Sequence, residues 1–246
     1  MPEGPSIVIA KQEMMHFIGK KVIAVSGNSK TDKERVLNKK LLDIKTWGKH
    51  LLFCFDDFSI RIHFMMFGTY RVNSKKDTPP RLSMKFKKGE INLYTCAVKV
   101  IDEPLDEIYD WSADVMSESW DQRAAKKKLK AMPEKFVTDA LLDQSVFSGV
   151  GNIIKNEVLY RIKVHPKNTI ADLPPGKLTK LVSEARNYSF DFLKWKKEYT
   201  LRKHWLAHTK KTCIRDGDKI VKEYLGRSNR RTFFCNTCQI LFSVDR

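Results

Sequence analysis

The residue types at the start of the chain, Pro2 followed by Glu3, are able to perform covalent chemistry. A methionine in front of proline is usually removed, and its loss would leave Pro2 with a free secondary amine. Such an amine attacks a carbonyl-like carbon to form an iminium, and Glu3 adds a carboxyl group within reach of that carbon. The alternative is structural: Pro2 begins the chain and Glu3 is an acid in the first turn of a helix. The pair alone does not decide between these interpretations.

A second reactive set lies near the other end of the chain, which has five cysteines in all. Cys235 and Cys238 have the Cys-x-x-Cys spacing that supplies half of a tetrahedral zinc site, and Cys213 lies upstream of them. Cys54 and Cys96 lie instead in apolar, strand-like runs, where buried thiols are common. Because few apolar residues accompany the last three cysteines, this segment needs a cross-link such as a metal ion to fold.

A glycine-bracketed turn joins two helical segments in the second half of the chain. Gly149 and Gly151 permit backbone conformations that expose amide groups, and Asn152 is placed to cap the helix that follows. Free N–H groups at the start of a helix bind anions such as a DNA phosphate. The turn therefore predicts a phosphate-binding site.

The composition indicates a folded protein with a polyanionic partner. Hydrophobic residues make up 42% of the chain, and the net charge is +17, from 46 basic and 29 acidic residues. Acidic residues are in excess only over residues 101–150, so two basic bodies flank an acidic middle. This distribution favours a clamp for nucleic acid, with a solvated basic surface as the alternative. No apolar run has the length of a membrane span and the first residues lack a secretory segment, so we expect an intracellular, cytoplasmic protein.

Hydrophobic periodicity divides the chain into a β-rich part and a helical part. We expect a helix over residues 5–18, followed by short antiparallel strands that form a β-sandwich. The expected strands are Val22–Val25, Lys49–Phe55, Ser59–Phe64, Thr69–Val72, Leu82–Phe86, Ile91–Tyr94 and Val98–Ile101. The expected later helices are Gln122–Lys130, Glu134–Gln144, Asn152–Ile162 and Lys177–Lys194. The fold class is α+β with several domains: residues 1–104 form the sandwich, 105–121 a linker, 122–212 a helical domain and 213–246 a hairpin module.

Four motifs together resemble the formamidopyrimidine-DNA glycosylase and endonuclease VIII family. The string LLDQSVFSGVGNIIKNE, which ends at Glu157, is similar to the family's helix–two-turn–helix. The N-terminal Pro-Glu-Gly-Pro looks like its endonuclease VIII branch, and the string GKHLL around Lys49 matches its β-hairpin lysine. The string RRTFFCNTCQ, from Arg230, resembles its zinc-finger hairpin. The motifs follow the family order, and the resemblance covers the entire chain.

The resemblance implies a bifunctional DNA glycosylase and abasic-site lyase that excises oxidised bases, with a weak tilt toward pyrimidines, and cleaves the strand by β,δ-elimination. The Pro2 amine would displace the damaged base from C1′ and form a Schiff base. Glu3 would assist opening of the sugar ring. Lys49 would hold the phosphates that flank the lesion, because a fixed ammonium stabilises the charge of a leaving phosphate. The alternative for Lys49 is a solvated lysine at a strand end.

Further DNA contacts are implied in the same way. Asn152 and Arg230 resemble the family's other phosphate clamps, with Gly151 in the same turn and Arg231 as an adjacent alternative to Arg230. Glu157 is either close to the site, as in the family, or an ordinary acid on a surface helix.

The loop RIHFMMFG resembles the family's loop that enters the duplex. Its residues Met65, Met66 and Phe67 would fill the space left by a flipped nucleotide. The alternative is that these three apolar residues belong to the core.

The family's zinc finger has two Cys-x-x-Cys halves, and here Asp216 takes the second ligand position after Cys213. The implied site is therefore a structural zinc held by Cys213, Asp216, Cys235 and Cys238, with one oxygen ligand in place of a thiolate. His208 and Asp218 are nearby substitutes, and a finger that folds without metal is a further alternative.

Ser6 departs from the family, which commonly has a glutamate there, and this leaves substrate preference and turnover open. The rival function is a non-catalytic recogniser of abasic or distorted DNA. A more remote one is a ribosome-associated RNA binder. We expect a nucleoid-associated monomer that acts on double-stranded DNA carrying an oxidised base or an abasic site.

Overall fold

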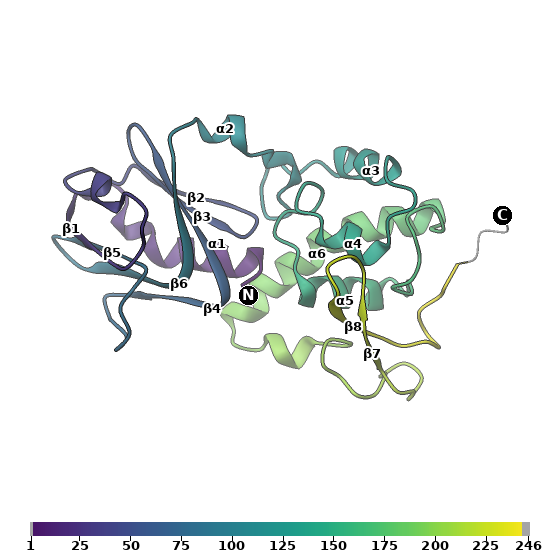
Figure 1. Cartoon of the computed structure of the whole chain (residues 1–246). Coiled ribbons are helices and arrows are strands. Elements are labelled where there is room, and N and C mark those ends of the chain that lie inside the picture. The colour runs from purple at the N-terminus through teal and green to yellow at the C-terminus, as the bar shows by residue number, and fades with distance from the viewer. Residues whose placement is uncertain (1, 243–246) are drawn as a thin grey trace. The chain divides into compact units, whose positions relative to one another are not determined.

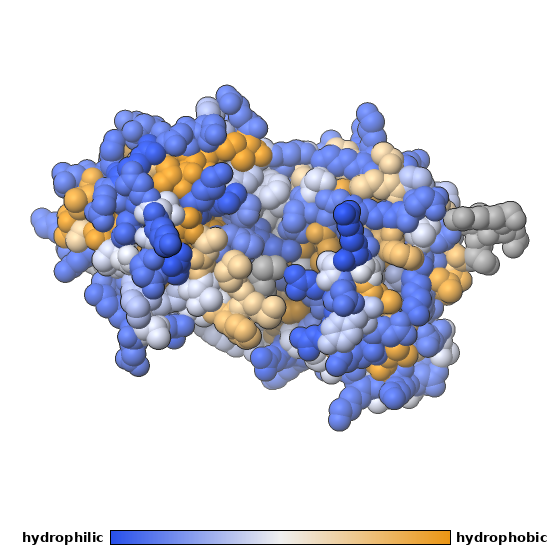
Figure 2. Space-filling view, in the orientation of Figure 1, coloured by the Kyte–Doolittle hydropathy of each residue, from blue (hydrophilic) through white to orange (hydrophobic). Residues whose placement is uncertain are grey.

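A computed structural model describes residues 2–242 of the chain and divides it into two compact units, residues 1–110 and 111–246 (Figure 1). Met1, whose removal the sequence predicts, lies outside the described residues. No helix within the described range combines the length and the apolar character that crossing a membrane requires. On the face shown in Figure 2, hydrophilic side chains cover most of the surface and apolar residues form separate patches.

The first unit is built on the helix α1 and a six-stranded antiparallel sheet. Helix α1 (Gly4–Met14) continues into a 3₁₀ turn at Met15–Phe17 and packs beside β2, β3 and β4. The strand order is β1-β5-β6-β4-β3-β2. The strands are β1 (Val22–Ser26), β2 (Asp43–Trp47), β3 (His50–Cys54), β4 (Ser59–Val72), β5 (Leu82–Phe86) and β6 (Glu90–Ile101).

Two long strands fold this sheet into the two layers of a β-sandwich. The first half of β4 pairs with β3 and with the second half of β6, whereas its second half pairs with the first half of β6, which also pairs with β5. The register shifts between Phe64 and Thr69, and Thr95 on β6 has a φ of 50°. Both strands therefore bend at the same level, and the core of the unit lies between the layers and under α1.

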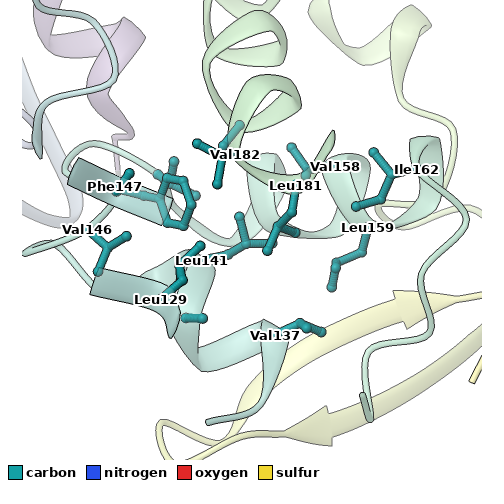
Figure 3. Packing of buried hydrophobic residues seen from close by; sticks show 14 of the residues in the cluster. Leu129, Val137, Leu141, Val146, Phe147, Val158, Leu159, Ile162, Leu181 and Val182 are labelled. Carbon is teal, nitrogen blue, oxygen red and sulfur yellow. The ribbon is translucent and has the colours of Figure 1, made fainter. Parts of the chain in front are cut away.

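The second unit is helical and carries a small hairpin. Its helices are α3 (Gln122–Lys130), α4 (Val137–Leu142), α5 (Asn152–Arg161) and α6 (Pro175–Lys197), and its hairpin is β7 (Val221–Leu225) with β8 (Arg230–Phe234). Leucine, valine and isoleucine side chains from α3, α4, α5 and α6 form one apolar core, part of which is seen in Figure 3. The Asp121 carboxylate caps α3 by accepting hydrogen bonds from the amides of Arg123 and Ala124. The cap explains why α3 begins where the sequence predicts.

The α+β fold class, the sandwich and the helical unit are confirmed, and the differences lie in the element boundaries. The expected pairs of strands on either side of residues 65–68 and 95–97 are continuous strands, because bulges and bends keep the ladder in one chain segment. Strand β2 was not expected, since its sequence DIKTW carries few apolar residues. The segment expected to be a linker contains the short helix α2 (Leu105–Ile108), and the division between the units falls after Asp110.

Candidate functional site

Glu3 occupies the N-cap position of α1 and is buried, with 4% of its surface exposed. Its φ of −99° and ψ of 167° are extended, so the residue precedes the helix and is not a first-turn acid. The Glu3 carbonyl accepts a hydrogen bond from the amide of Ser6 (2.8 Å), whereas its carboxylate makes no capping bond. The side chain of Glu3 is therefore buried without capping α1, and Pro2 lies half-buried directly before it.

Lys49 lies in the two-residue turn between β2 and β3 and not inside a strand as expected. Trp47 pairs with His50 across this turn, and Gly48 has a φ of 52°. A glycine with positive φ in the first central position is the usual solution for so tight a hairpin. The half-buried Lys49 side chain is therefore presented at the end of a rigid pair of strands.

A cluster of aromatic rings that was not predicted lies beside this turn. The His50 ring lies 5.3 Å from that of His63 and 5.7 Å from that of Tyr109, and Trp47 donates a hydrogen bond to the carbonyl of Asp110 (2.9 Å). Burial lowers the pKa of His50 to about 3, and the charges of Arg61, His63 and Lys49 act in the same direction. His50 is therefore neutral near neutral pH.

This depressed pKa predicts that the protein loses stability in mild acid. His50 stays neutral in the folded chain down to about pH 3, whereas it takes up a proton near its ordinary pKa of 6.5 when unfolded. The free energy of unfolding is therefore highest, with respect to His50, above pH 6.5, and it decreases as the pH falls from 6.5 toward 3. At pH 5 it should be lower by about 1–2 kcal/mol, since one pKa unit corresponds to roughly 1.4 kcal/mol.

Urea unfolding at pH 7.5 and pH 5.5 checks this prediction for the unmodified chain, a His50→Gln variant and the exposed-histidine control His16→Gln. We expect the acid-induced loss to be smaller in His50→Gln only. An equal loss in all three proteins would contradict the assignment to His50.

Met65, Met66 and Phe67 lie at the bend of β4 with exposed fractions of 48%, 57% and 84%. They are not core residues, which removes the alternative interpretation of these side chains. Phe67 has a φ of 121°, and the next residue must be glycine: a Cβ on Gly68 would lie 2.7 Å from the carbonyl oxygen of Thr95. The bend therefore projects three consecutive apolar side chains into solvent.

Gly151 is the N-cap residue of α5, and Asn152 is the first residue inside the helix. The expectation that the Asn152 side chain caps the helix is wrong, because no side chain caps α5. The Asn152 amide instead donates a hydrogen bond to the carbonyl of Arg231 in β8 (2.9 Å). This contact links the glycine-rich turn to the hairpin on which the exposed Arg230 and Arg231 lie.

A buried polar network, which was not predicted, strengthens this link. The fully buried Lys155 ammonium donates to the Thr232 hydroxyl (2.8 Å) and to the carbonyl of Arg231 (3.5 Å). The Asn156 side chain accepts a hydrogen bond from the amide of Phe233 (3.3 Å) and also contacts His208 Nδ1 (3.0 Å). A lysine within an apolar helical sequence gives no sign of such burial, so only the structure reveals it.

Glu157 is fully buried, which excludes the surface-helix interpretation. Its carboxylate accepts hydrogen bonds from the amides of Leu206, Ala207 and His208 at 2.8, 2.9 and 2.7 Å. Burial raises the pKa of Glu157 although these three donors oppose the shift. The residue fixes the loop that leads from α6 toward the cysteine-rich segment.

A Glu157→Gln variant should be less stable by about 2–3 kcal/mol, because the amide N–H₂ group of glutamine meets backbone donors that then remain unsatisfied. Thermal unfolding measured against Glu118→Gln, an exposed glutamate of the same unit, checks this expectation. Equal melting temperatures for the two variants would show that the three hydrogen bonds contribute nothing net.

The last candidate is a cluster of four ligating side chains: Cys213, Asp216, Cys235 and Cys238. Their ligand atoms all lie within 4.8 Å of one another. The Sγ atoms of Cys213 and Cys238 are 3.8 Å apart, and Cys235 Sγ lies 3.2 Å from the Asp216 carboxylate. These four groups could hold a metal ion, and the spacing of the two sulfurs suits ligands at about 2.3 Å around a tetrahedral centre.

The proposed substitute ligands belong to other contacts. His208 lies against Asn156 through Nδ1, and the Asp218 carboxylate accepts a hydrogen bond from the Thr237 hydroxyl. Tyr160 contacts Cys213 Sγ through its hydroxyl (3.0 Å), and Arg215 donates to Cys238 Sγ (3.4 Å). Such outer contacts orient metal ligands, so the cluster has the surroundings of a metal centre.

The first unit therefore carries Pro2, Glu3, Lys49 and the exposed apolar residues of β4. The second unit brings Asn152, the β7–β8 hairpin and the cysteine cluster together through α5.

Comparison with known proteins places both units in one family. The formamidopyrimidine-DNA glycosylase N-terminal domain model matches residues 1–98, and the H2TH domain model of the same glycosylase matches residues 112–189. The Xenopus laevis protein "Endonuclease 8-like 3" is 29% identical over 241 residues, which cover 93% of this chain and 39% of that protein. This chain thus spans about two fifths of the length of that relative.

Two further proteins match over most of their own length. The "DNA-(apurinic or apyrimidinic site) lyase Nei2" of Mycolicibacterium smegmatis is 27% identical over 212 residues, covering 80% of this chain and 81% of that protein. The crystal structure of the Lactococcus lactis formamidopyrimidine-DNA glycosylase, non-covalently bound to DNA that contains an AP site, superposes with a TM-score of 0.84. It is 25% identical and covers 96% of this chain and 99% of that one. Because the two domain models together span most of the sequence and the fold matches over nearly its whole length, the chain belongs to the formamidopyrimidine-DNA glycosylase and endonuclease VIII family.

Proposed function

We propose that this protein is a DNA glycosylase and abasic-site lyase of base excision repair, with Pro2 as its nucleophile. The observation that carries the proposal is the buried carboxylate of Glu3, which does not cap α1 although it occupies the cap position. A buried acid beside an amine at the start of a helix is an arrangement suited to sugar chemistry. The N-terminal end of a helix disfavours protonation of a neighbouring amine, which keeps more of it nucleophilic.

In the proposed reaction the Pro2 nitrogen forms a bond to C1′ of a flipped nucleotide while the bond from C1′ to the damaged base breaks. Glu3 gives a proton to the ring oxygen, the ring opens and the iminium forms. Loss of a C2′ proton then expels the 3′ phosphate, and a second elimination expels the 5′ phosphate. Lys49 stabilises the negative charge of these leaving groups from the β2–β3 turn.

DNA binding is assigned to both units. Gly151, Asn152 and Arg230 would contact phosphates, since the start of α5 and the β7–β8 hairpin are joined through the carbonyl of Arg231. Met65, Met66 and Phe67 would fill the space left by the extruded nucleotide, as apolar wedges do elsewhere. We propose that the protein acts as a monomer on double-stranded DNA at the nucleoid, on oxidised bases and in particular on oxidised pyrimidines.

We further propose that the ion held by Cys213, Asp216, Cys235 and Cys238 is zinc. Three thiolates with one carboxylate, in the closed arrangement described above, form a structural and not a catalytic set. When bound, the ion cross-links the segment around Cys213 with the end of β8, and it thereby fixes the hairpin that presents Arg230.

Borohydride reduction in the presence of abasic-site DNA tests the nucleophile directly. The expected product is a covalent adduct whose DNA-linked peptide begins at Pro2, from protein whose intact mass lacks Met1. An adduct that maps to a lysine would refute Pro2 as the nucleophile. Tight and specific binding with no adduct at all would favour the rival, a non-catalytic recogniser, for which the serine at position 6 in place of the family's usual glutamate is the motivating feature.

A further inference from the structure

A basic groove lies on the first unit, apart from the residues assigned to chemistry. It has a volume of about 660 Å³, and its ionisable lining residues are His16, Lys20, Lys85, Lys87, Lys88 and Glu90. We refer to it below as the lysine groove. These residues come from two segments, the stretch after α1 and the hairpin formed by the end of β5, the β5–β6 turn and the start of β6.

The lysine groove has a strong excess of positive charge. Within residues 2–242, none of its four lysines forms an ion pair with an acid. The lining acid Glu90 is already engaged, because its carboxylate lies 3.3 Å from the ammonium of Lys75. Four unneutralised ammonium groups around one open depression attract an anion with more than one charge.

The turn that carries Lys87 and Lys88 is held in one conformation. The amide of Phe86 donates to the carbonyl of Gly89 (2.9 Å), and the Asn73 side chain accepts a hydrogen bond from the amide of Glu90 (3.0 Å). Gly89 has a φ of 98°, and a Cβ added there would clash with Asn73 Oδ1. Because this turn is already ordered, a ligand does not have to order it on binding.

The opposite wall is also fixed. The Lys20 ammonium lies over the ring of Phe17, 5.6 Å from its centre, and Phe17 stacks on Phe86 with 4.5 Å between ring centres. Both rings are buried, so they support the lysine stem and offer no face for a base to stack on. The two phenyl rings are therefore closed to nucleobases, and the groove presents mainly the point charges of its four lysines.

From these features we propose that the lysine groove is a second DNA-binding site, which holds the sugar–phosphate backbone without reading sequence. Ammonium groups on both walls of an open groove match a chain of phosphates, which carries one charge at every step. The choice of DNA as the polyanion rests on the proposed function. The site would add non-specific affinity for undamaged duplex and would take no part in the chemistry at Pro2.

The test compares Lys87→Gln/Lys88→Gln with the matched control Lys196→Gln/Lys197→Gln, an adjacent exposed pair at the end of α6. Both variants lose the same net charge. Binding of a long undamaged duplex is measured by fluorescence anisotropy between about 50 and 200 mM salt. The groove variant should lose roughly tenfold in affinity at the lowest salt, and its log–log salt slope should fall by about one to two, since each phosphate contact contributes about 0.9. A Lys20→Gln variant should show a smaller change of the same kind.

Equal effects of the two double variants would overturn the inference, because general charge would then explain them. A dependence on Lys87 and Lys88 for binding phosphatidylserine vesicles but not DNA would also overturn it, since the ligand would be a membrane. Cleavage of a short abasic-site duplex at saturating enzyme should be unchanged in the groove variant. If the unmodified chain fails to cleave that duplex but the groove-dependent binding persists, the proposed function fails and the inference stands.

Discussion

Replacing Glu3 with glutamine should lower base excision by about three orders of magnitude, the usual range for loss of a positioned acid or base. Glutamine keeps the size of the side chain but cannot release a proton to the ring oxygen. The buried side chain makes no capping hydrogen bond, so α1 should remain intact. Single-turnover excision on a lesion-containing duplex measures the effect, and the affinity for the same duplex should change by no more than about threefold.

The control is Glu13→Gln, which makes the same change at an exposed position of α1. Its excision rate should equal that of the unmodified chain. If Glu3→Gln excised bases at full rate, or if it lost affinity and rate in equal proportion, Glu3 would not be the acid.

The second large effect is expected at the metal cluster. Replacing Cys235 with serine removes one of the four proposed zinc ligands, and structural zinc contributes on the order of 10–16 kcal/mol to the folding of zinc-finger peptides. The β7–β8 hairpin should then lose its fixed position, and affinity for DNA should fall by about a hundredfold or more, because Arg230 and Asn152 no longer share a site.

Metal content and hydrogen exchange test this expectation independently of activity. The variant should contain less than one zinc per chain, and the amides of β7 and β8 should exchange fast while those of α3 remain protected. Cys54→Ser, which changes a thiol in β3, is the control and should retain full metal content. Unaltered zinc and unaltered exchange in Cys235→Ser would show that Cys235 is not a ligand.

A substitution at Asp216 should raise the affinity of the cluster for zinc, whereas the loss of a cysteine should lower it. Asp216 is exposed, and the resemblance described above implies a thiolate ligand at its position. An Asp216→Cys variant should bind zinc more tightly, by about tenfold or more, because thiolate is the softer ligand for this ion. Competition with a chromophoric chelator measures the affinity, and unchanged affinity would show that the ion does not contact residue 216.

Much of this architecture is readable from the sequence because local signals dominate. The Asp121 cap, the glycine bracket around Val150 and the Cys-x-x-Cys spacing each depend on a few neighbouring residues, and the observed elements follow them closely. The bends of β4 and β6 are different, since they result from the close approach of Gly68 to Thr95, residues far apart in the chain. In both β4 and β6, the two strands that the sequence predicts on either side of the bend are therefore one continuous strand.

The polar interior of the second unit also escaped prediction, for a related reason. Lys155, Asn156 and Glu157 are consecutive polar residues that point to different sides of the helix, and side chains of these types are usually solvated. All three are buried, because β8 and the 206–208 loop supply their hydrogen-bond partners. Only the tertiary contacts show whether such polar side chains are solvated or buried with hydrogen-bond partners.

The bend in β4 assigns solvent exposure and tight backbone packing to different, neighbouring residues. Residues 65–67 project from it without supporting the core, whereas Gly68 lies against backbone and has no room for a side chain. Residues 65–67 can therefore be substituted without loss of the fold, provided that residue 68 remains glycine. Under the proposed function, exchanges at residues 65–67 would change the contact with DNA and leave the bend of β4 as it is.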